Sequence, residues 1–191
     1  MSELISGKII SAQINEELRN EVEHLKARGV EPCLAVILVG EDPASAVYVR
    51  NKKRTCAELG IRSVGHDLPE TTSQEELENL VHDLNNDPSV HGILNQFPLP
   101  NGLDESQVIR TISPEKDVDG LHPLNAGLIA MGQPSFISCT PYGVLQMLKR
   151  SDISTSGKKV VVLGRSNLVG RPIATPVSYT HLRAHETEAD L

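Results

Sequence analysis

The stretch CLAVILVGEDPASAVYVRNKKRTCAELG, residues 33–60, joins an apolar run to a helical pattern. Residues 33–39 are apolar without interruption, which is typical of a strand in a parallel sheet that is covered on both faces. Asp42 followed by Pro43 is a favourable N-cap and first-turn pair, so a helix is predicted to begin there. Gly60 is expected to end this helix. The stretch therefore predicts one strand–helix unit of an α/β protein.

The flanking segments continue the alternation of helix and strand. Apolar residues three or four apart predict a helix over residues 8–28, and a strand is expected over residues 61–68. Thr72 and Glu75 form a capping-box pattern at the start of the next helix. The remaining expectations are a strand over 90–94, a short helix within 104–112, an irregular stretch from Ser113 to about Cys139, a helix from Thr140 with Val144, Leu145 and Leu148 inward, and a strand over 158–164. This order predicts an α/β fold with a mainly parallel sheet.

Composition limits the possible environments and partners. The chain has 191 residues and a net charge of −7, which argues against a nucleic-acid partner. The apolar run at residues 34–39 is too short to cross a bilayer, and the N-terminus lacks the pattern of a secretory signal. We expect a cytoplasmic protein with no membrane partner.

Cys33, Cys56 and Cys139 share no metal-ligand spacing, so we expect reduced cysteines packed as small apolar groups and no metal site.

Polar residues follow the predicted strands where an open parallel sheet binds its ligands, beyond the carboxyl ends. Tyr48 and Lys52 lie one turn apart on the helix after residues 33–39, and Gln96 follows the strand over 90–94. Asp119 belongs to the irregular loop. Each residue also has an ordinary explanation: a solvated lysine, a strand cap or a turn aspartate. Taken alone, these residues support a ligand-binding α/β protein and no more.

A glycine-containing turn, VVVLGRSNLVGRP over 160–172, follows the last predicted strand. Gly164 permits a tight turn, Ser166 and Gly170 follow, and a helix N-terminus there offers amides to a phosphate. Arg165 beside the turn suits a phosphorylated ribose. A pattern with two glycines is weak evidence for a dinucleotide when it stands alone.

Five segments together resemble one family. In chain order they are VYVRNKKRTCAELGI, HGILNQFPLP, SPEKDVDGLHP, CTPYGVLQML and KKVVVLGRSNLVGRP. They resemble the bifunctional methylenetetrahydrofolate dehydrogenase/methenyltetrahydrofolate cyclohydrolase family, and the resemblance covers residues 1 to about 174. It implies an N-terminal three-layer α/β domain joined to a Rossmann NADP-binding domain, with folate in the cleft between them, and a homodimer.

The resemblance also implies a role for each matching residue. Tyr48 would stack on the aminobenzoate part of the folate, Lys52 would be the catalytic lysine of the cyclohydrolase step, and Gln96 would hydrogen-bond that lysine. Asp119 would hold the pterin ring. The residues that would bind NADP are Gly164, Arg165, Ser166 and Gly170. The implied activity belongs to one-carbon metabolism: NADP-dependent oxidation of 5,10-methylenetetrahydrofolate, then hydrolysis of the 5,10-methenyl product to 10-formyltetrahydrofolate.

Some features depart from the family pattern. Asn95 stands where the family usually has an apolar residue, and we expect it to disturb local packing or the environment of the lysine. We predict a folate-binding catalytic domain over 1–140, the truncated start of the Rossmann domain over 141–176, and a foreign or disordered tail over 177–191. The alternatives are a fragment that binds folate without turnover, a nucleic-acid module using the basic cluster at 50–54, and a partly folded product. Within that cluster, only Lys52 is expected to act in the site, with Arg50, Lys53 and Arg54 solvated.

Overall fold

The computed structural model describes residues 4–155, 157–163 and 183–186. It divides the chain into two compact units, one formed by Ile14–Val118 and the other by Met1–Gln13 with Asp119–Leu191. The first helix, α1 (Gly7–Ala27), crosses the boundary between them. Within the described part of the chain, no helix is both long and apolar enough to cross a membrane.

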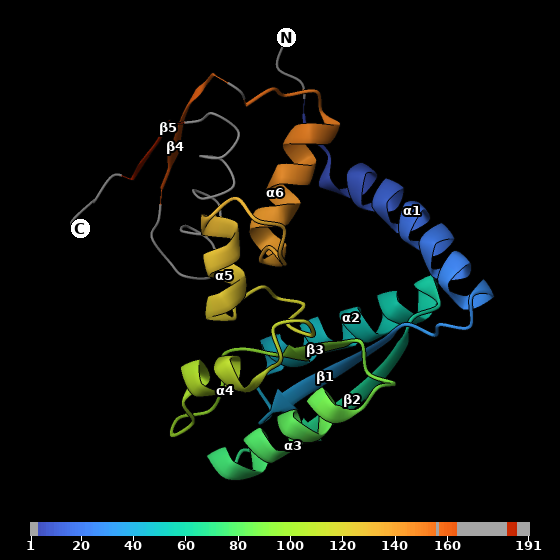
Figure 1. The fold of residues 1–191 in the computed structure, drawn as a ribbon, viewed down its shortest axis with the longest axis vertical. Helices are drawn as coiled ribbons and strands as arrows, with labels where there is room; N and C mark the ends of the chain where they lie inside the picture. Colours follow the sequence, from blue (N-terminus) through green and yellow to red (C-terminus); the bar gives the residue numbers. More distant parts are fainter. Residues whose placement is uncertain (1–3, 156, 164–182, 187–191) are drawn as a thin grey trace. The chain divides into compact units, whose positions relative to one another are not determined.

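The unit Ile14–Val118 is built on a three-stranded parallel sheet. Its strands are β1 (Cys33–Val39), β2 (Arg62–Leu68) and β3 (Gly92–Asn95), in the order β2-β1-β3 (Figure 1). In the middle of the sheet, Ile37 pairs with His66 on one side and with Asn95 on the other. The predicted parallel sheet is confirmed. Strand β3 begins two residues later than expected and includes Asn95.

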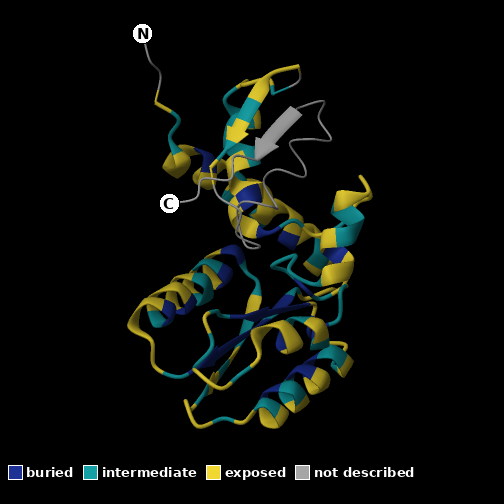
Figure 2. Cartoon of the chain, turned by 90° about the vertical axis from the view of Figure 1, so that its left-hand side faces the viewer, coloured by how far each residue is buried: buried dark blue, intermediate teal, exposed yellow. Residues whose placement is uncertain are grey.

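Helices cover both faces of this sheet, which makes three layers. Helix α2 (Pro43–Leu59) lies on one face, and α3 (Gln74–Asn86) and α4 (Glu105–Thr111) cover the other (Figure 1). Alternate residues of β1 point to opposite faces of the sheet. Ala35 and Ile37 pack in the cluster with α3 and α4, and Val36 packs in the cluster with α2. Figure 2 shows the central strand as buried and the outer helix faces as exposed. Burial on both faces is the physical reason for the uninterrupted apolar run.

Both predicted ends of α2 are confirmed. The Asp42 side chain accepts a hydrogen bond from the backbone N–H of Ser45 at 2.7 Å. Gly60 ends the helix in the left-handed region, at φ +77°. A Cβ atom at Gly60 would also lie 2.9 Å from the Nζ atom of Lys26, so the end of that flexible side chain would have to shift.

The predicted start of α3 is wrong by one residue. Its N-cap is Ser73, and the capping box is formed by Ser73 and Glu76 instead of Thr72 and Glu75. The hydroxyl of Thr72 donates to the carbonyl of Pro69 at 2.7 Å, and its backbone N–H donates to the same carbonyl at 3.0 Å. Thr72 therefore closes a turn, which leaves Ser73 to cap the helix.

The second unit contains α5 (Pro123–Ala130), α6 (Cys139–Arg150) and the parallel pair β4 (Lys159–Val162) and β5 (Arg183–Glu186). Helix α5 corrects the prediction that Ser113 to Cys139 is irregular. Its sequence, PLNAGLIA, shows no polar and apolar period, and its N-cap is His122, which lies outside the usual set of capping residues. Strand β5 lies inside the predicted tail.

The inward face of α6 also differs from the prediction. Pro141 is buried, and Leu145 and Leu148 are half-buried, but Val144 is 38% exposed. Successive helical residues are turned by about 100°, so the positions 141, 145 and 148 share a stripe and Val144 lies beside it.

Candidate functional site

Helix α2 presents Tyr48 and Lys52 on one face, because residues four apart lie one above the other on a helix. Val49, next to Tyr48 in sequence, packs in the cluster with Val36 and Leu94 of the sheet, and Cys56, one turn beyond Lys52, is also buried. Tyr48 is 62% exposed, so its ring is free to stack against a planar ligand, and Lys52 is half-buried. Packing of Val49 against the sheet therefore fixes the direction in which Tyr48 and Lys52 point.

Lys52 and Gln96 lie in contact. The Nζ atom of Lys52 donates to the Oε1 atom of Gln96 at 3.2 Å. Gln96 is held in turn, because its Nε2 atom donates to the carbonyl of Phe97 at 2.7 Å and its backbone N–H donates to the carbonyl of Ile37 at 2.9 Å. The amide oxygen of Gln96 thus faces the lysine, and the ammonium has two further N–H donors for a ligand.

The other basic residues of α2 lie on different faces. Arg50 and Arg54 are exposed, and Arg54 forms an ion pair with Glu58 at 3.7 Å. Lys53 differs from the expectation, since it is half-buried and its Nζ atom lies 3.4 Å from Asp67 Oδ1. The Lys53 side chain crosses above Gly65, where a Cβ atom would lie 2.4 Å from the same Nζ atom. Of the four basic side chains, Lys52 is the one that contacts Gln96.

Asn95 is a buried amide in an otherwise apolar environment. It is 2% exposed, and neither its Oδ1 nor its Nδ2 atom has a hydrogen-bond partner among the described residues. Ile93 belongs to the cluster on the α3 side and Leu94 to the cluster on the α2 side. Alternation along the strand places Asn95 on the α3 side, opposite to Gln96. The expected disturbance therefore concerns core packing, while the contact of Lys52 with Gln96 is intact.

Asp119 belongs to the second unit, where it is half-buried. The Sγ atom of Cys139 donates to its Oδ1 atom at 3.6 Å. Cys139 is exposed, which corrects the expectation that all three cysteines are packed apolar groups. The other two, Cys33 and Cys56, are buried as expected, and burial raises the pKa of both thiols. Sequence reasoning had no signal for the contact of Cys139 with Asp119, because the two residues are 20 positions apart.

Two predictions stay open. The meeting of Asp119 with Tyr48, Lys52 and Gln96 in one cleft remains a prediction, since these residues belong to two separately described units. The four residues of the predicted cofactor turn lie outside the described residues: Gly164, Arg165, Ser166 and Gly170.

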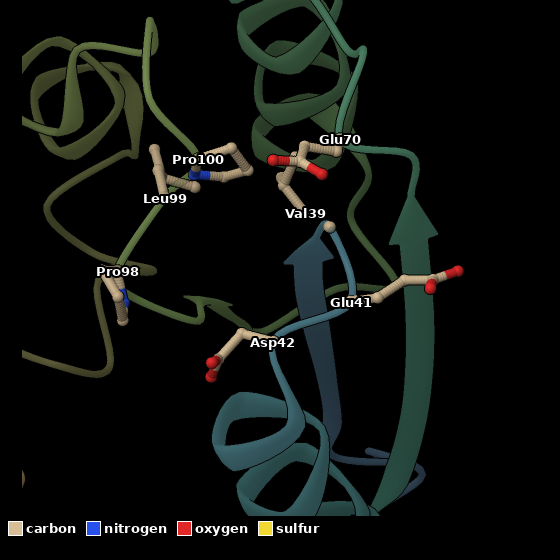
Figure 3. A pocket seen from close by; sticks show the side chains of 8 residues that line it. Val39, Glu41, Asp42, Glu70, Pro98, Leu99 and Pro100 are labelled. Atoms are coloured by element: carbon tan, nitrogen blue, oxygen red, sulfur yellow. The ribbon is translucent and has the colours of Figure 1, made fainter.

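A pocket of about 320 Å³ opens at the carboxyl end of β1 (Figure 3). Its lining is acidic and rich in proline, and consists of Val39, Gly40, Glu41, Asp42, Glu70, Pro98, Leu99 and Pro100. The amide of Ser45 holds the pKa of Asp42 below its usual range, so this side chain is a carboxylate near neutral pH. None of the lining residues is among the predicted site residues. An acidic lining disfavours anions, so the pocket is distinct in character from the face with Lys52.

The side chains on this face of α2 can bind a ligand and transfer a proton. A half-buried ammonium is held by an amide oxygen, and an exposed aromatic ring lies one turn away. Such a face can hold a planar ligand against the ring and exchange a proton with it through the lysine.

Comparison with known proteins shows which family carries these features. Residues 5–119 match the model of the tetrahydrofolate dehydrogenase/cyclohydrolase catalytic domain. The chain belongs to the tetrahydrofolate dehydrogenase/cyclohydrolase family. Residues 138–187 match the NAD(P)-binding domain of the same family.

Curated relatives in this family are named bifunctional protein FolD. The chain is 53% identical to the protein from Agathobacter rectalis over 174 residues, which is 91% of this chain and 62% of the relative. It is 54% identical to the Geobacillus thermodenitrificans protein over 186 residues, 97% of this chain and 64% of the relative. The chain thus spans less than two thirds of the length of these relatives.

Solved structures of the tetrahydrofolate dehydrogenase/cyclohydrolase family share the fold. The bifunctional FolD enzyme from Campylobacter jejuni has a TM-score of 0.93 at 44% identity, covering 98% of this chain and 68% of that one. The Trypanosoma brucei enzyme, solved with NADP cofactor and inhibitor, has a TM-score of 0.90 at 34% identity, covering 96% of this chain and 64% of that one. Both comparisons confirm the predicted α/β fold and family.

Proposed function

We propose that this chain carries the folate-binding and cyclohydrolase site of a bifunctional methylenetetrahydrofolate dehydrogenase/cyclohydrolase. The observation that supports the proposal most directly is the 3.2 Å contact between the Nζ atom of Lys52 and the Oε1 atom of Gln96, beside the exposed ring of Tyr48. The substrates proposed are tetrahydrofolate derivatives: the 5,10-methylene form for oxidation and the 5,10-methenyl form for hydrolysis.

The hydrolysis needs a group that moves protons around one water molecule. The water attacks the methenyl carbon and loses one proton, the bond from that carbon to one ring nitrogen breaks as the second water proton passes to that nitrogen, and the product is 10-formyltetrahydrofolate. Lys52 lies where a half-buried amine can carry this proton. Gln96 accepts one N–H of the lysine and so limits its rotation. Tyr48 would hold the aminobenzoate ring by stacking.

The oxidation belongs to the other half of the proposed activity. NADP, when bound, would accept the hydride from the methylene carbon. The residues proposed to hold it are Gly164, Arg165, Ser166 and Gly170, in the segment that matches the family's NAD(P)-binding domain. Asp119 is proposed to hold the pterin ring, which would orient the folate for both reactions.

Further parts of the proposal follow from the family. We propose a cytoplasmic homodimer, with a folate-binding domain over 1–140, the start of the cofactor-binding domain over 141–176 and a separate tail over 177–191. A second candidate is a fragment that binds folate without turning it over. The observation in its favour is that the chain spans less than two thirds of its curated relatives.

The decisive experiment is a cyclohydrolase assay on 5,10-methenyltetrahydrofolate, comparing the unmodified chain with Lys52→Met. Loss of a group that transfers protons is expected to lower the rate by roughly 100-fold or more. Lys53→Met is the matched control, because it removes the neighbouring lysine, which pairs with Asp67 on another face of α2. We expect the control to keep most of the activity.

Equal rates for Lys52→Met and the unmodified chain would contradict the assignment of Lys52. If the unmodified chain is folded but shows no hydrolysis, titration with a folate analogue, with and without NADP, identifies the second candidate. Saturable binding without turnover would support the binding fragment and rule out an active cyclohydrolase in this chain.

A further inference from the structure

The segment from Ser135 to Cys139 runs directly against the loop that carries Asp119. Gly120 follows Asp119 and has a φ of +63°. A Cβ atom at Gly120 would lie 2.7 Å from the carbonyl oxygen of Phe136 and 2.9 Å from the backbone nitrogen of Ser138. Such contacts are shorter than real Cβ atoms make, so the two backbones approach closely and a glycine is required there.

A second contact ties the same segment to α5. The hydroxyl of Ser135 donates to the Oδ1 atom of Asn125 at 2.8 Å, and Asn125 is 3% exposed. Helix α5 begins directly after the loop that contains Asp119 and Gly120. The segment before α6 therefore lies close to the chain at Gly120 and is hydrogen-bonded to it at Asn125.

The third contact reaches the Asp119 carboxyl itself. Cys139 is the first residue of α6, and its Sγ atom lies 3.6 Å from the Oδ1 atom of Asp119. A thiol is a weak hydrogen-bond donor, and a carboxylate is a strong acceptor that favours even a weak donor. Because the backbone contacts already bring the segment against the loop, the thiol can limit the side-chain rotation of Asp119.

We propose that Cys139 is a positioning residue for Asp119, and that it acts on folate binding through the orientation of this carboxylate. The inference rests on the proposed function, in which Asp119 holds the pterin ring. Cys139 would raise folate affinity without touching the folate. Since the thiol is a weak donor, we expect its removal to weaken binding about three- to tenfold.

A double-mutant cycle on the full chain tests this inference. The dissociation constant of 5-formyltetrahydrofolate is measured by calorimetry for the unmodified chain, Cys139→Ala, Asp119→Ala and the double variant. We expect Cys139→Ala to weaken binding about three- to tenfold when Asp119 is present and to have no effect in the Asp119→Ala background. Cys139→Ser keeps a hydroxyl donor at this position and is expected to restore most of the affinity. Thr140→Ala, at the next and equally exposed position, is the control and should bind normally.

Any one of three results would overturn the inference. If Cys139→Ala weakens binding by the same factor in both backgrounds, Cys139 acts on the fold and not through Asp119. If Asp119→Ala binds as tightly as the unmodified chain, or if the unmodified chain does not bind, the carboxylate has no role for Cys139 to support. In either of these last cases the comparison of the unmodified chain with Lys52→Met still decides the proposed cyclohydrolase activity, because both of those chains keep Asp119.

Discussion

Lys52 and Gln96 are 44 positions apart, and each reaches the contact for a local reason. Lys52 lies on a helix whose rotation is fixed by the burial of Val49 and Cys56. Gln96 follows β3, and its backbone continues the pairing with β1 through the carbonyl of Ile37. The family resemblance implied a hydrogen bond between this lysine and this glutamine. The structure shows the Nζ atom of Lys52 and the Oε1 atom of Gln96 within hydrogen-bond distance.

Gln96→Ala tests the role of this amide. Without the amide oxygen, the ammonium of Lys52 loses its hydrogen bond to Gln96 and gains rotational freedom. We expect a fall of about tenfold in the cyclohydrolase rate with unchanged global stability, since misplacing a catalytic group is costly. Gln107→Ala, an exposed glutamine on α4, is the control. Full activity of Gln96→Ala would show that Lys52 works without this contact.

Asn95 offers a test of stability at the same strand. Its buried amide makes no hydrogen bond among the described residues, and burial of an unpaired polar group costs free energy. Replacement by leucine, which has a similar shape, is expected to raise the free energy of unfolding by about 1–2 kcal/mol. Denaturant unfolding measures the change, with the exposed Asn79→Leu as control. A loss of stability in Asn95→Leu would mean that the amide is satisfied in solution.

At the scale of single elements, side-chain caps determine where the helices begin. The sequence TTSQEE, residues 71–76, contains three overlapping capping-box patterns, and the pattern alone does not choose between them. The structure chooses Ser73, because Thr72 is used in the turn with Pro69. Helix α5 was missed for a related reason, since its cap is a histidine.

Substitution of the two candidate caps separates them by stability. Ser73→Ala removes the hydroxyl that accepts from the backbone N–H of Glu76 and should lower the free energy of unfolding by about 1 kcal/mol. Thr72→Ala removes only the turn contact with Pro69, so we expect a smaller loss. Thermal or denaturant unfolding compares the two variants. A larger loss for Thr72→Ala would favour the cap predicted from the sequence.

The cap of α4 predicts a dependence on pH. Hydrogen bonds from the Ser106 hydroxyl and the Gln107 backbone N–H hold the pKa of Asp104 below its ordinary value of about 3.8. A depressed pKa in the folded state means that the ionised form stabilises the fold. This contribution is present above the ordinary pKa and is lost as the pH falls through the folded-state pKa.

We therefore expect Asp104→Asn to lose less stability than the unmodified chain when the pH falls from about 7 to about 3. The measurement is the denaturant midpoint at both pH values. Asp83→Asn, which changes an exposed carboxylate on α3, is the control and should follow the unmodified chain. An identical pH dependence for Asp104→Asn would contradict the stabilising role of this carboxylate.

At the scale of the whole molecule, burial is unevenly shared between the two units. Among the described residues, nearly all buried apolar side chains belong to Ile14–Val118; Ile10 and Pro141 are in the other unit. Regions with few buried contacts open locally at lower free energy. Hydrogen exchange should therefore be slowest in β1 and clearly faster in α5 and α6. Equal protection of α6 and β1 would show that one cooperative core includes both units.

Elements with local sequence signals were predictable from the amino-acid order alone. The apolar run at 33–39, the Asp42 and Gly60 ends of α2 and the order of strands and helices from α1 to α4 were all predicted, because periodicity and capping depend on neighbouring residues. Five motifs in order also indicated the family, which the comparisons confirm. The site roles of Tyr48, Lys52, Gln96 and Asp119 stay proposals that came from this resemblance.

Contacts between side chains that are distant in sequence could be identified only from the folded structure. The contact of Cys139 with Asp119, the ion pair of Lys53 with Asp67 and the unpaired burial of Asn95 have no local signal. Each depends on which strands are neighbours and on how closely two backbones approach. Helical and strand periods place a residue on a face of its own element, and packing between elements decides what that face touches.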